Sequence, residues 1–286
     1  MITCNLMGGL GNQLFQIFAT ISYAIKSKNK FVFLNVDKLG IPPTTIRPTY
    51  WNTLLSNLKT FLIEELPQPM HVIREKEFSY NELPVEQMEN TNVMIFGYFQ
   101  SYKYFQEHYD IICRMIGLEK KKTELLNKLG LNKDLLENSC SMHFRIGDYK
   151  KIQHVHPLAT YEYYERSLTH IQKEIPEQKF TIYYFCEDDD IEDVLQIVSP
   201  LAEKFPDYNF ERGTNTLEDW EQMLLMSCCH HNIIANSSFS WWAATLNTWS
   251  DKIVCYPSVW FGPSANHDLK DLCPSTFEKV EPNFGS

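Results

Sequence analysis

The chain has 286 residues, and its 26 lysines and arginines against 36 aspartates and glutamates give a formal net charge of −10 at pH 7. That charge disfavours sequence-independent binding to nucleic acid or to an anionic membrane surface. Hydrophobic residues make up 44% of the chain and charged residues 22%, which excludes a disordered protein.

The first part of the chain begins with a predicted strand over residues 2–7, a run of glycines, and a helix in which apolar residues recur with helical spacing. Further strands are predicted over residues 31–34 and 93–96, and a helix over residues 102–115. Several prolines interrupt residues 37–90, so no long element is predicted there.

From about residue 120 a charged helical stretch, residues 118–136, leads into a regular alternation of strands and helices. The strands are predicted over residues 141–145, 180–186, 232–235 and 252–256, and the helices over residues 161–174, 191–198, 217–229 and 239–246. Such alternation predicts a parallel sheet covered on both faces.

At roughly 150 residues per domain, the length fits two domains. We place the boundary near residues 120–138, with an N-terminal domain of residues 1–130 and a C-terminal domain of residues 131–286. A helix near the C-terminus could cross back to the first domain.

No run of 18 apolar residues predicts a membrane span, and the N-terminus lacks the basic region and cleavage site of a secretion signal. The eight cysteines include no Cys-x-x-Cys pair, so neither a zinc cage nor a redox motif is indicated. We expect a soluble, cytoplasmic protein with reduced thiols.

The glycine run, residues 8–13, reads Gly-Gly-Leu-Gly-Asn-Gln. Glycines there let backbone amides approach a phosphate at a helix N-terminus. The run is neither a P-loop, which needs Gly-Lys-Ser/Thr, nor a dinucleotide fingerprint, because Leu14 stands where the third glycine belongs. A tight strand-to-helix turn without a ligand is the alternative.

A second segment, residues 143–149, reads His-Phe-Arg-Ile-Gly-Asp-Tyr. In a strand, His143 and Arg145 point to one face and the apolar residues between them to the other. Both would emerge at the C-terminal end of a parallel strand, where open α/β sheets bind ligands. Arg145 could clamp a diphosphate through two hydrogen bonds, or form a structural ion pair with Asp148.

Two further segments follow predicted strands. Residues 236–242 place Asn236, Ser237 and Ser238 at the start of a helix, where hydroxyls and amides favour an anion; helix capping by serine is the alternative. Residues 187–190 are all acidic, which suits either a divalent metal or the first turn of a helix. Glu187 and Asp188, nearest the strand, could instead meet a base or ribose.

These segments together resemble the α-1,2-fucosyltransferase family. The resemblance rests, in chain order, on residues 8–13, on Gly-Tyr-Phe-Gln at 97–100, on residues 143–149, on Phe-Cys-Glu-Asp at 185–188 and on Ile-Ile-Ala-Asn-Ser-Ser-Phe-Ser-Trp-Trp-Ala-Ala at 233–244. It implies a GT-B-like α/β fold of two Rossmann-like domains. It further implies GDP-fucose as donor, bound by the C-terminal domain, inversion at the anomeric carbon, and no metal or other cofactor.

Two positions depart from the family's pattern. The second arginine that the family usually carries is Ile146 here, and strand alternation turns that residue toward the core. An acidic residue of the family is replaced by Gln222, and Glu218, Asp219 or Glu221 could take its place. These departures bear on donor affinity more than on the class of reaction.

The resemblance predicts a galactoside α-1,2-fucosyltransferase of the soluble bacterial or viral type, whose partners are GDP-fucose and a galactose-containing glycan. Arg145 would grip the diphosphate, His143 would lie beside the nucleotide, and Asp148 would act as general base or would orient Arg145. The predicted donor-binding residues are Gly9, Gly11, Asn12, His143, Arg145, Glu187, Asp188, Gln222, Asn236, Ser237, Ser238 and Phe239. The predicted acceptor-binding residues are Gln13, Tyr98 and Gln100.

Two other functions stay open from the sequence. Asp188 and Asp190 could hold a metal in a transferase of another nucleotide sugar. The chain could also be a glycan- or nucleotide-binding module that has lost catalysis.

Overall fold

A computed structural model describes residues 1–42, 44–85, 91–176, 178–265 and 267–281. The chain divides into two compact units. The first comprises Met1–Lys121 and His267–Pro274, and the second Lys122–Asn266 and Ser275–Ser286. The division thus falls nine residues before the expected boundary at residue 130. The segment that crosses back to the first unit is a stretch of loop and turns, whereas the sequence had left open a helix there.

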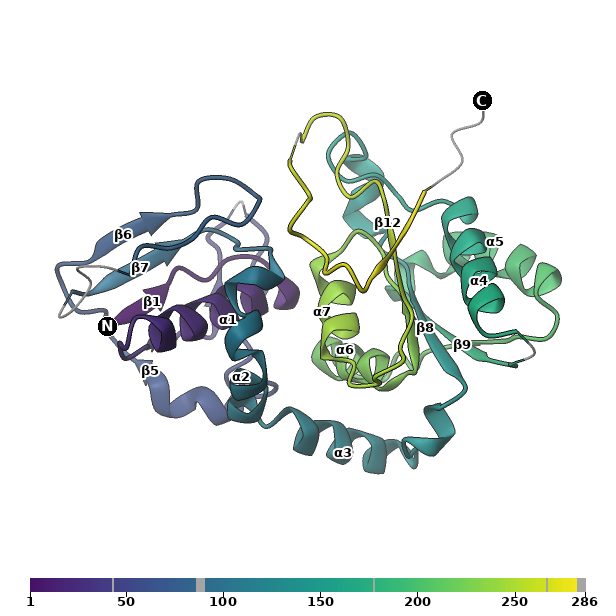
Figure 1. The fold of residues 1–286 in the computed structure, drawn as a ribbon, viewed down its shortest axis with the longest axis horizontal. Coiled ribbons are helices and arrows are strands. Elements are labelled where there is room, and N and C mark those ends of the chain that lie inside the picture. Colours follow the sequence, from purple (N-terminus) through teal and green to yellow (C-terminus); the bar gives the residue numbers. More distant parts are fainter. Residues whose placement is uncertain (43, 86–90, 177, 266, 282–286) are drawn as a thin grey trace. The chain divides into compact units, whose positions relative to one another are not determined.

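The first unit is built on a parallel sheet of three strands in the order β1 (Ile2–Cys4), β7 (Val93–Phe96), β6 (His71–Arg74). Helix α1 (Leu10–Lys26) packs along one face of this sheet (Figure 1). Leu14, Phe18 and Ile21 of its apolar stripe are completely buried, as the helical spacing predicted, and Ile25 near its end is partly buried. Strand β6 was not predicted.

Shorter elements complete the first unit. The predicted helix over residues 102–115 is two 3₁₀ turns followed by a shorter α-helix, which ends at Gly117 in the left-handed conformation (φ 69°). The elements are β2 (Phe33–Leu34), β3 (Lys38–Leu39), β4 (Arg47–Pro48), η1 (Ser56–Phe61), β5 (Leu62–Ile63), η2 (Tyr102–Tyr104), η3 (Gln106–His108) and α2 (Tyr109–Ile116). Helix α3 (Leu118–Leu129) follows and begins in the first unit and ends in the second.

The second unit contains the parallel sheet that the alternating pattern predicted, with six strands in the order β10-β9-β8-β11-β12-β13. The strands are β8 (Ser139–His143), β9 (Thr181–Phe185), β10 (Asn209–Arg212), β11 (His231–Ile233), β12 (Val254–Pro257) and β13 (Glu278–Val280). Met142, Ile182 and Ile233 are fully buried in adjacent strands, so the centre of the sheet is the core.

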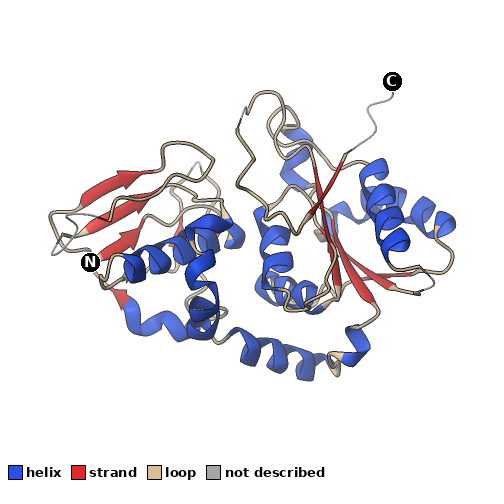
Figure 2. Ribbon diagram, viewed as in Figure 1, coloured by secondary structure: helices blue, strands red, loops and turns tan. Residues whose placement is uncertain are grey.

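Helices cover both faces of this sheet. Helices α4 (Tyr161–Glu174) and α5 (Ile191–Lys204) lie on one face, and α6 (Asp219–Cys228) and α7 (Ser238–Leu246) on the other (Figures 1 and 2). Two short 3₁₀ segments, η5 (Gly147–Lys151) and η6 (Asp188–Asp190), follow strands β8 and β9. A third, η4 (Asp134–Leu136), precedes β8.

The order of the strands creates a switch point between β8 and β11. From β8 the chain adds β9 and β10 on one side, and then returns to add β11, β12 and β13 on the other. Crossover loops therefore leave in opposite directions at the C-terminal ends of β8 and β11. Open α/β sheets bind their ligands in the crevice that such a reversal opens.

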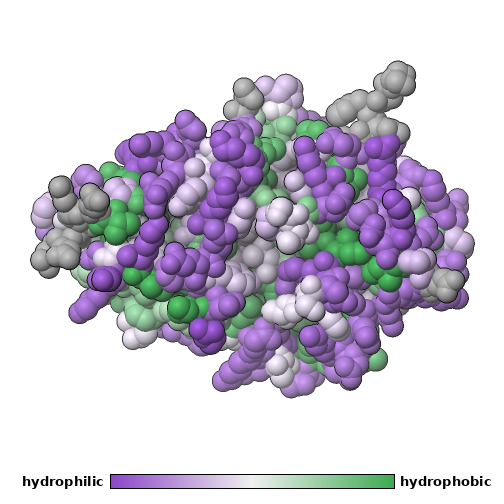
Figure 3. Space-filling view, in the orientation of Figure 1, coloured by the Kyte–Doolittle hydropathy of each residue, from purple (hydrophilic) through white to green (hydrophobic). Residues whose placement is uncertain are grey.

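None of the helices in the described ranges combines the length and apolar character that a membrane crossing requires. On the face drawn in Figure 3, hydrophilic residues predominate and the hydrophobic ones form patches among them.

Candidate functional site

Most of the predicted site residues of the second unit follow three neighbouring strands. Arg145 and Asp148 come after β8, Glu187 and Asp188 after β9, and the segment from Asn236 after β11. Because these strands are parallel, all three loops lie at the C-terminal edge of the sheet, on both sides of the switch point.

Arg145 is the centre of a charged cluster. Its Nη1 donates to Oε1 of Glu187 and its Nη2 to Oδ1 of Asp148, and its guanidinium lies 4.8 Å from the centre of the Tyr149 ring. Strand β8 ends at His143, so Arg145 lies just beyond it instead of within it as predicted. Two carboxylates and a ring thus fix the orientation of a side chain that is 19% exposed.

Gly147 makes room for this cluster. A Cβ at this position would lie 3.0 Å from Nη1 of Arg145 and 3.2 Å from Oε2 of Glu187, and the residue has a φ of +29°. Its backbone N–H donates to Oδ2 of the buried Asp190 at 2.7 Å. Any larger residue would therefore disturb both the guanidinium and the backbone turn that carries Asp148.

The acidic run after β9 is engaged by protein groups. Oδ1 of Asp188 accepts hydrogen bonds from Arg212 and, at 3.2 Å, from Asn215. Asp190 holds the Gly147 amide and lies 3.3 Å from Nζ of Lys150. In the described part of the chain no three His, Cys, Asp or Glu side chains are grouped so as to hold a metal ion.

His143 ends strand β8 as a buried, neutral imidazole. It is 7% exposed, and its ring centre lies 5.4 Å from that of Phe239 in the first turn of α7. Burial, with a smaller contribution from the Arg145 charge, lowers the pKa of His143 to about 3. Its Nδ1 is buried and has no hydrogen-bond partner among the described residues.

The loop before α7 caps that helix and also connects neighbouring loops through hydrogen bonds. Oγ of Ser237 accepts from the Phe239 N–H at 3.3 Å, which is the serine cap that the alternative interpretation predicted. Nδ2 of Asn236 donates to the carbonyls of Pro157 and Trp260, at 2.8 and 3.1 Å. Asn236 thus ties together the loops that follow β8 and β12. Its buried Oδ1 has no partner among the described residues.

Gln222 and its acidic neighbours form hydrogen bonds at the start of α6. Nε2 of Gln222 donates to the Leu217 carbonyl at 3.1 Å, at the start of α6. Glu218 and Glu221 form the capping box of that helix, and Glu221 also pairs with Lys128 at 2.6 Å. These two carboxylates already satisfy the helix terminus, which argues against their replacing the missing acidic residue.

In the first unit, the glycine run and the loop after β7 meet at the C-terminal edge of the sheet. Gly8 has a φ of +77°, and Gly9 is the N-cap of α1. Nε2 of Gln100 donates to Oδ1 of Asn12 at 2.8 Å, which joins the two loops. Tyr98, in the same loop, is 42% exposed.

Gln13 does not face an acceptor, contrary to the prediction from the sequence. Its side chain is completely buried, and its Nε2 donates to the carbonyls of Gly8 and Pro48, at 3.0 and 2.8 Å. The residue anchors the glycine turn to strand β4. Position 13 therefore serves the shape of the turn, because a fully enclosed amide cannot touch a substrate.

Glu75 is the residue of this edge that the sequence did not reveal. It follows β6, and its two carboxylate oxygens accept the backbone N–H groups of Tyr98 and Phe99 at 2.7 and 2.9 Å. Phe99 has a φ of +53°, unusual for a residue other than glycine. Burial raises the pKa of Glu75 to about 7, although both amide bonds oppose the rise. No sequence motif identified Glu75, because it lies in residues 37–90, where several prolines interrupt any regular pattern.

The sequence profile of Glycosyl transferase family 11 matches residues 1–260, and the chain therefore belongs to this family of glycosyltransferases. It is 26% identical over 305 residues to the Alpha-1,2-colitosyltransferase of Escherichia coli, covering 98% of this chain and 99% of that protein. It is 29% identical over 297 residues to the O-antigen biosynthesis glycosyltransferase WbnK of Escherichia coli, covering 91% of this chain and 95% of that one.

Two solved structures are also similar to the chain. A mutant of Arabidopsis thaliana FUT1 in complex with GDP aligns with a TM-score of 0.46 and 9% identity, over 88% of this chain and 69% of that one. POFUT1 in complex with GDP aligns with a TM-score of 0.45 and 10% identity, over 89% of this chain and 97% of that one.

The buried state of His143 predicts a specific acid sensitivity. In the unfolded chain this histidine takes up a proton as the pH falls through about 6.5, whereas in the folded chain it stays neutral down to about pH 3. Between these two pH values the unfolded state binds more protons than the folded state. The free energy of unfolding therefore decreases as the pH is lowered through this window. At about 1.4 kcal/mol per pKa unit, the loss attributable to His143 is roughly 2–3 kcal/mol by pH 4.5.

Denaturant unfolding at pH 7.0 and 4.5 tests this expectation. His143→Gln should lose less stability between the two values than the unmodified protein, while His154→Gln, at an exposed position, should not differ from it. An unchanged pH dependence in His143→Gln would show that the imidazole is already protonated or solvated in the folded state.

Proposed function

We propose that this glycosyltransferase moves L-fucose from GDP-fucose to the 2-hydroxyl of a galactose-like acceptor, with inversion and without a metal ion. The observation that carries the proposal is the position of Arg145. Its guanidinium is fixed just beyond β8, next to the point where the strand order reverses. A guanidinium in that place suits a diphosphate, because its planar N–H groups can bind two oxygens at once.

The leaving group sets the electrostatic requirement of the reaction. As the bond between the sugar and the diphosphate breaks, negative charge grows on the GDP oxygen, and donors that are already in place stabilise it best. Arg145 would carry most of this role, with the first amides of α7 around Ser238 beside it. His143 would contribute as a neutral hydrogen-bonding group, since its low pKa keeps it uncharged.

One relative suggests a second candidate for the donor sugar. One relative is named as an α-1,2-colitosyltransferase. Colitose is L-fucose without its 3-hydroxyl, so the two sugars require the same handedness and the same methyl pocket. A site that hydrogen-bonds the 3-hydroxyl would strongly reject the sugar that lacks it, whereas an apolar site would discriminate weakly. Parallel assays with both GDP-sugars separate these two donors.

The ion pair between Asp148 and Arg145 supports the orienting role for Asp148 more than the role of general base. A base must face the acceptor hydroxyl, whereas this carboxylate is bound to the guanidinium and is 57% exposed. In the first unit, we place the acceptor against Tyr98 and Gln100, which Glu75 and Asn12 hold. Gly9, Gly11 and Asn12 stay in the proposal as donor contacts of that unit.

We also propose that the protein acts in the cytoplasm. Cys4, Cys140, Cys186, Cys229 and Cys255 lie in the described part of the chain as thiols that form no disulfide. This state suits a reducing compartment.

The nucleotide is the first test. GDP and GDP-fucose should raise the melting temperature more than UDP and UDP-sugars do, equally with EDTA and with Mg²⁺. A ligand at 100 times its dissociation constant adds about 2.7 kcal/mol of apparent stability, which a melting scan detects. Larger shifts with UDP-sugars, or shifts that need the metal, would favour the metal-dependent transferase instead.

Substitution of Arg145 tests the diphosphate clamp. Arg145→Ala should lower turnover by about 10²–10³, the usual effect of losing one group that stabilises transition-state charge. Arg145→Lys should not restore it, because an ammonium cannot reproduce the two parallel hydrogen bonds. Arg166→Ala is the control, since that guanidinium donates to the Glu281 carbonyl and has no place in the cluster. Near-normal turnover in a folded Arg145→Lys protein would contradict the clamp.

Asp148→Asn separates the two roles of that carboxylate. If Asp148 orients Arg145, the variant should bind GDP more weakly and turn over more slowly, because the guanidinium loses one of its two anchors. If Asp148 is the base, turnover should fall by roughly 10²–10⁴ while GDP affinity stays unchanged. Calorimetry with GDP and initial rates distinguish these results, and Asp193→Asn, which pairs with Lys150 at 2.7 Å, serves as the control.

A further inference from the structure

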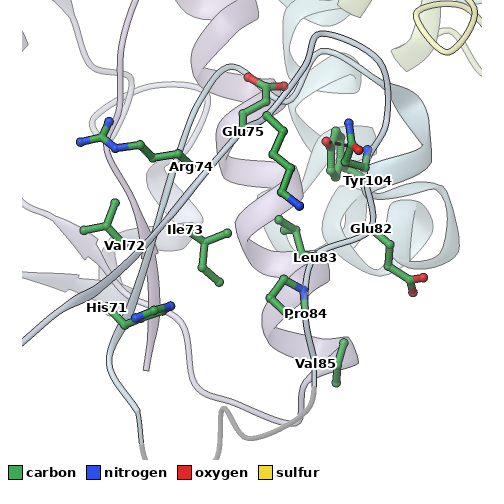
Figure 4. Close-up of a pocket in the computed structure, with 12 residues that line it drawn as sticks. His71, Val72, Ile73, Arg74, Glu75, Glu82, Leu83, Pro84, Val85 and Tyr104 are labelled. Atoms are coloured by element: carbon green, nitrogen blue, oxygen red, sulfur yellow. Dashed lines mark hydrogen bonds between the residues drawn. The ribbon is translucent and has the colours of Figure 1, made fainter.

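A groove of about 740 Å³ runs along the free edge of strand β6 in the first unit (Figure 4). Residues 71–76 form one wall and residues 81–85 the other, and Tyr104 stands at one end. Volumes of this order hold ligands larger than one sugar ring. None of the predicted site residues lines the groove.

The wall formed by β6 carries backbone groups that the sheet leaves unpaired. The N–H groups of His71 and Glu75 donate to the carbonyls of Asn92 and Phe96, on the side of strand β7. Because peptide groups alternate along a strand, those of Val72 and Arg74 face the opposite side, into the groove. No backbone hydrogen bond joins residues 81–85 to residues 71–76, and both stretches are described. The groove therefore offers donors and acceptors in a row.

The other features of the groove are aliphatic surfaces and balanced charge. Ile73 and Leu83 lie on facing walls, with Pro84 and Val85 farther along (Figure 4). Side chains of both signs surround them: Arg74 and Lys76 against Glu75 and Glu82. A nucleotide or another strong anion gains little from such a mixture. A neutral ligand with hydroxyl groups and C–H faces matches both the peptide groups and the aliphatic walls.

One end of the groove is continuous with the proposed acceptor contacts. Glu75 lines the groove and also accepts the amides of Tyr98 and Phe99. On the opposite wall, the Asn81 N–H donates to the Tyr104 hydroxyl at 3.1 Å, which fixes the start of residues 81–85. A chain that has its terminal sugar at Tyr98 would therefore have this groove beside its next residues.

We propose that the groove beside β6 binds the saccharide units of the acceptor that precede the galactose, so that the substrate is an oligosaccharide instead of a single sugar. The proposal rests on the proposed function, because it takes Tyr98 as an acceptor contact. An extended peptide paired to β6 is the competing occupant, since an open strand edge can also accept a strand. The continuity with the acceptor loop favours the saccharide.

Two acceptors and two groove variants test the proposal. The acceptors are methyl galactoside and a tetrasaccharide that ends in the same galactose. Leu83→Trp fills the groove, and Val72→Pro removes an outward N–H without removing a bond to β7. Ile111→Trp is the matched control, because Ile111 is exposed on α2, away from the lining residues. Circular dichroism and melting temperature establish that each variant is folded.

In the unmodified protein, kcat/KM should be about tenfold or more higher for the tetrasaccharide, the effect of one or two added hydrogen bonds with apolar contact. Both groove variants should lose this preference through KM and keep their rate with methyl galactoside, whereas Ile111→Trp should keep the preference. Equal use of both acceptors by the unmodified protein, or a preference that survives in both folded groove variants, would overturn the proposal.

Binding of the tetrasaccharide without donor gives a readout that does not depend on transfer. Saturation-transfer NMR should detect binding in the unmodified protein and in Ile111→Trp, and weakened binding in Leu83→Trp. If no transfer occurs but tetrasaccharide binding is weakened in Leu83→Trp, the proposed function is wrong and the groove is still a saccharide-binding site. If the tetrasaccharide does not bind, while an extended peptide binds to the unmodified protein and not to Leu83→Trp, the groove is a peptide site and the proposal is wrong.

Discussion

The guanidinium of Arg145 is held by carboxylates from the loops after two neighbouring strands, and the geometry of this edge of the sheet depends on that contact. Glu187 follows β9 and Asp148 follows β8, so the cluster fastens together the loops of two adjacent strands. Gly147 leaves room for this contact, because a Cβ there would press on both Arg145 and Glu187. If a diphosphate binds Arg145 as we propose, it meets a guanidinium that already donates one N–H to each of two carboxylates and has three further N–H groups.

A carboxylate plays a related role in the first unit, where Glu75 accepts two consecutive backbone amides of the loop after β7. The Arg145 cluster orients a side chain. The Glu75 carboxylate instead fixes a backbone conformation, with a positive φ at Phe99. The enclosure that raises the pKa of Glu75 to about 7 means that this anchor is weakened as the pH falls below neutrality. At both sheet edges, an acidic residue thus holds the group that we expect to meet a substrate.

Three of the strands that the sequence did not predict share one physical property. Strands β6, β10 and β13 are the outer strands of their sheets, and each exposes half or more of its residues. An edge strand has a neighbour on one side only, so it lacks the continuous apolar run that identifies a buried parallel strand. The strands β8, β9 and β11 lie inside the sheet and were predicted, β9 from a run of apolar residues and the other two from apolar residues in and just beyond the strand. Residues 71–74 become a strand only when β7 pairs with them.

The sequence alone determined the parallel α/β character of the second unit, the burial of Ile146 and the group of segments that surround Arg145. These follow from short-range patterns: apolar runs, helical spacing and residues placed directly after a strand. The tertiary structure alone decided that Gln13 is an enclosed anchor, that Asp148 is bound to Arg145, and that Glu75 supports the loop after β7. Each of these depends on contacts between segments far apart in the chain or on the turn of one loop, and the identity of a residue does not specify which partner the fold will bring to it.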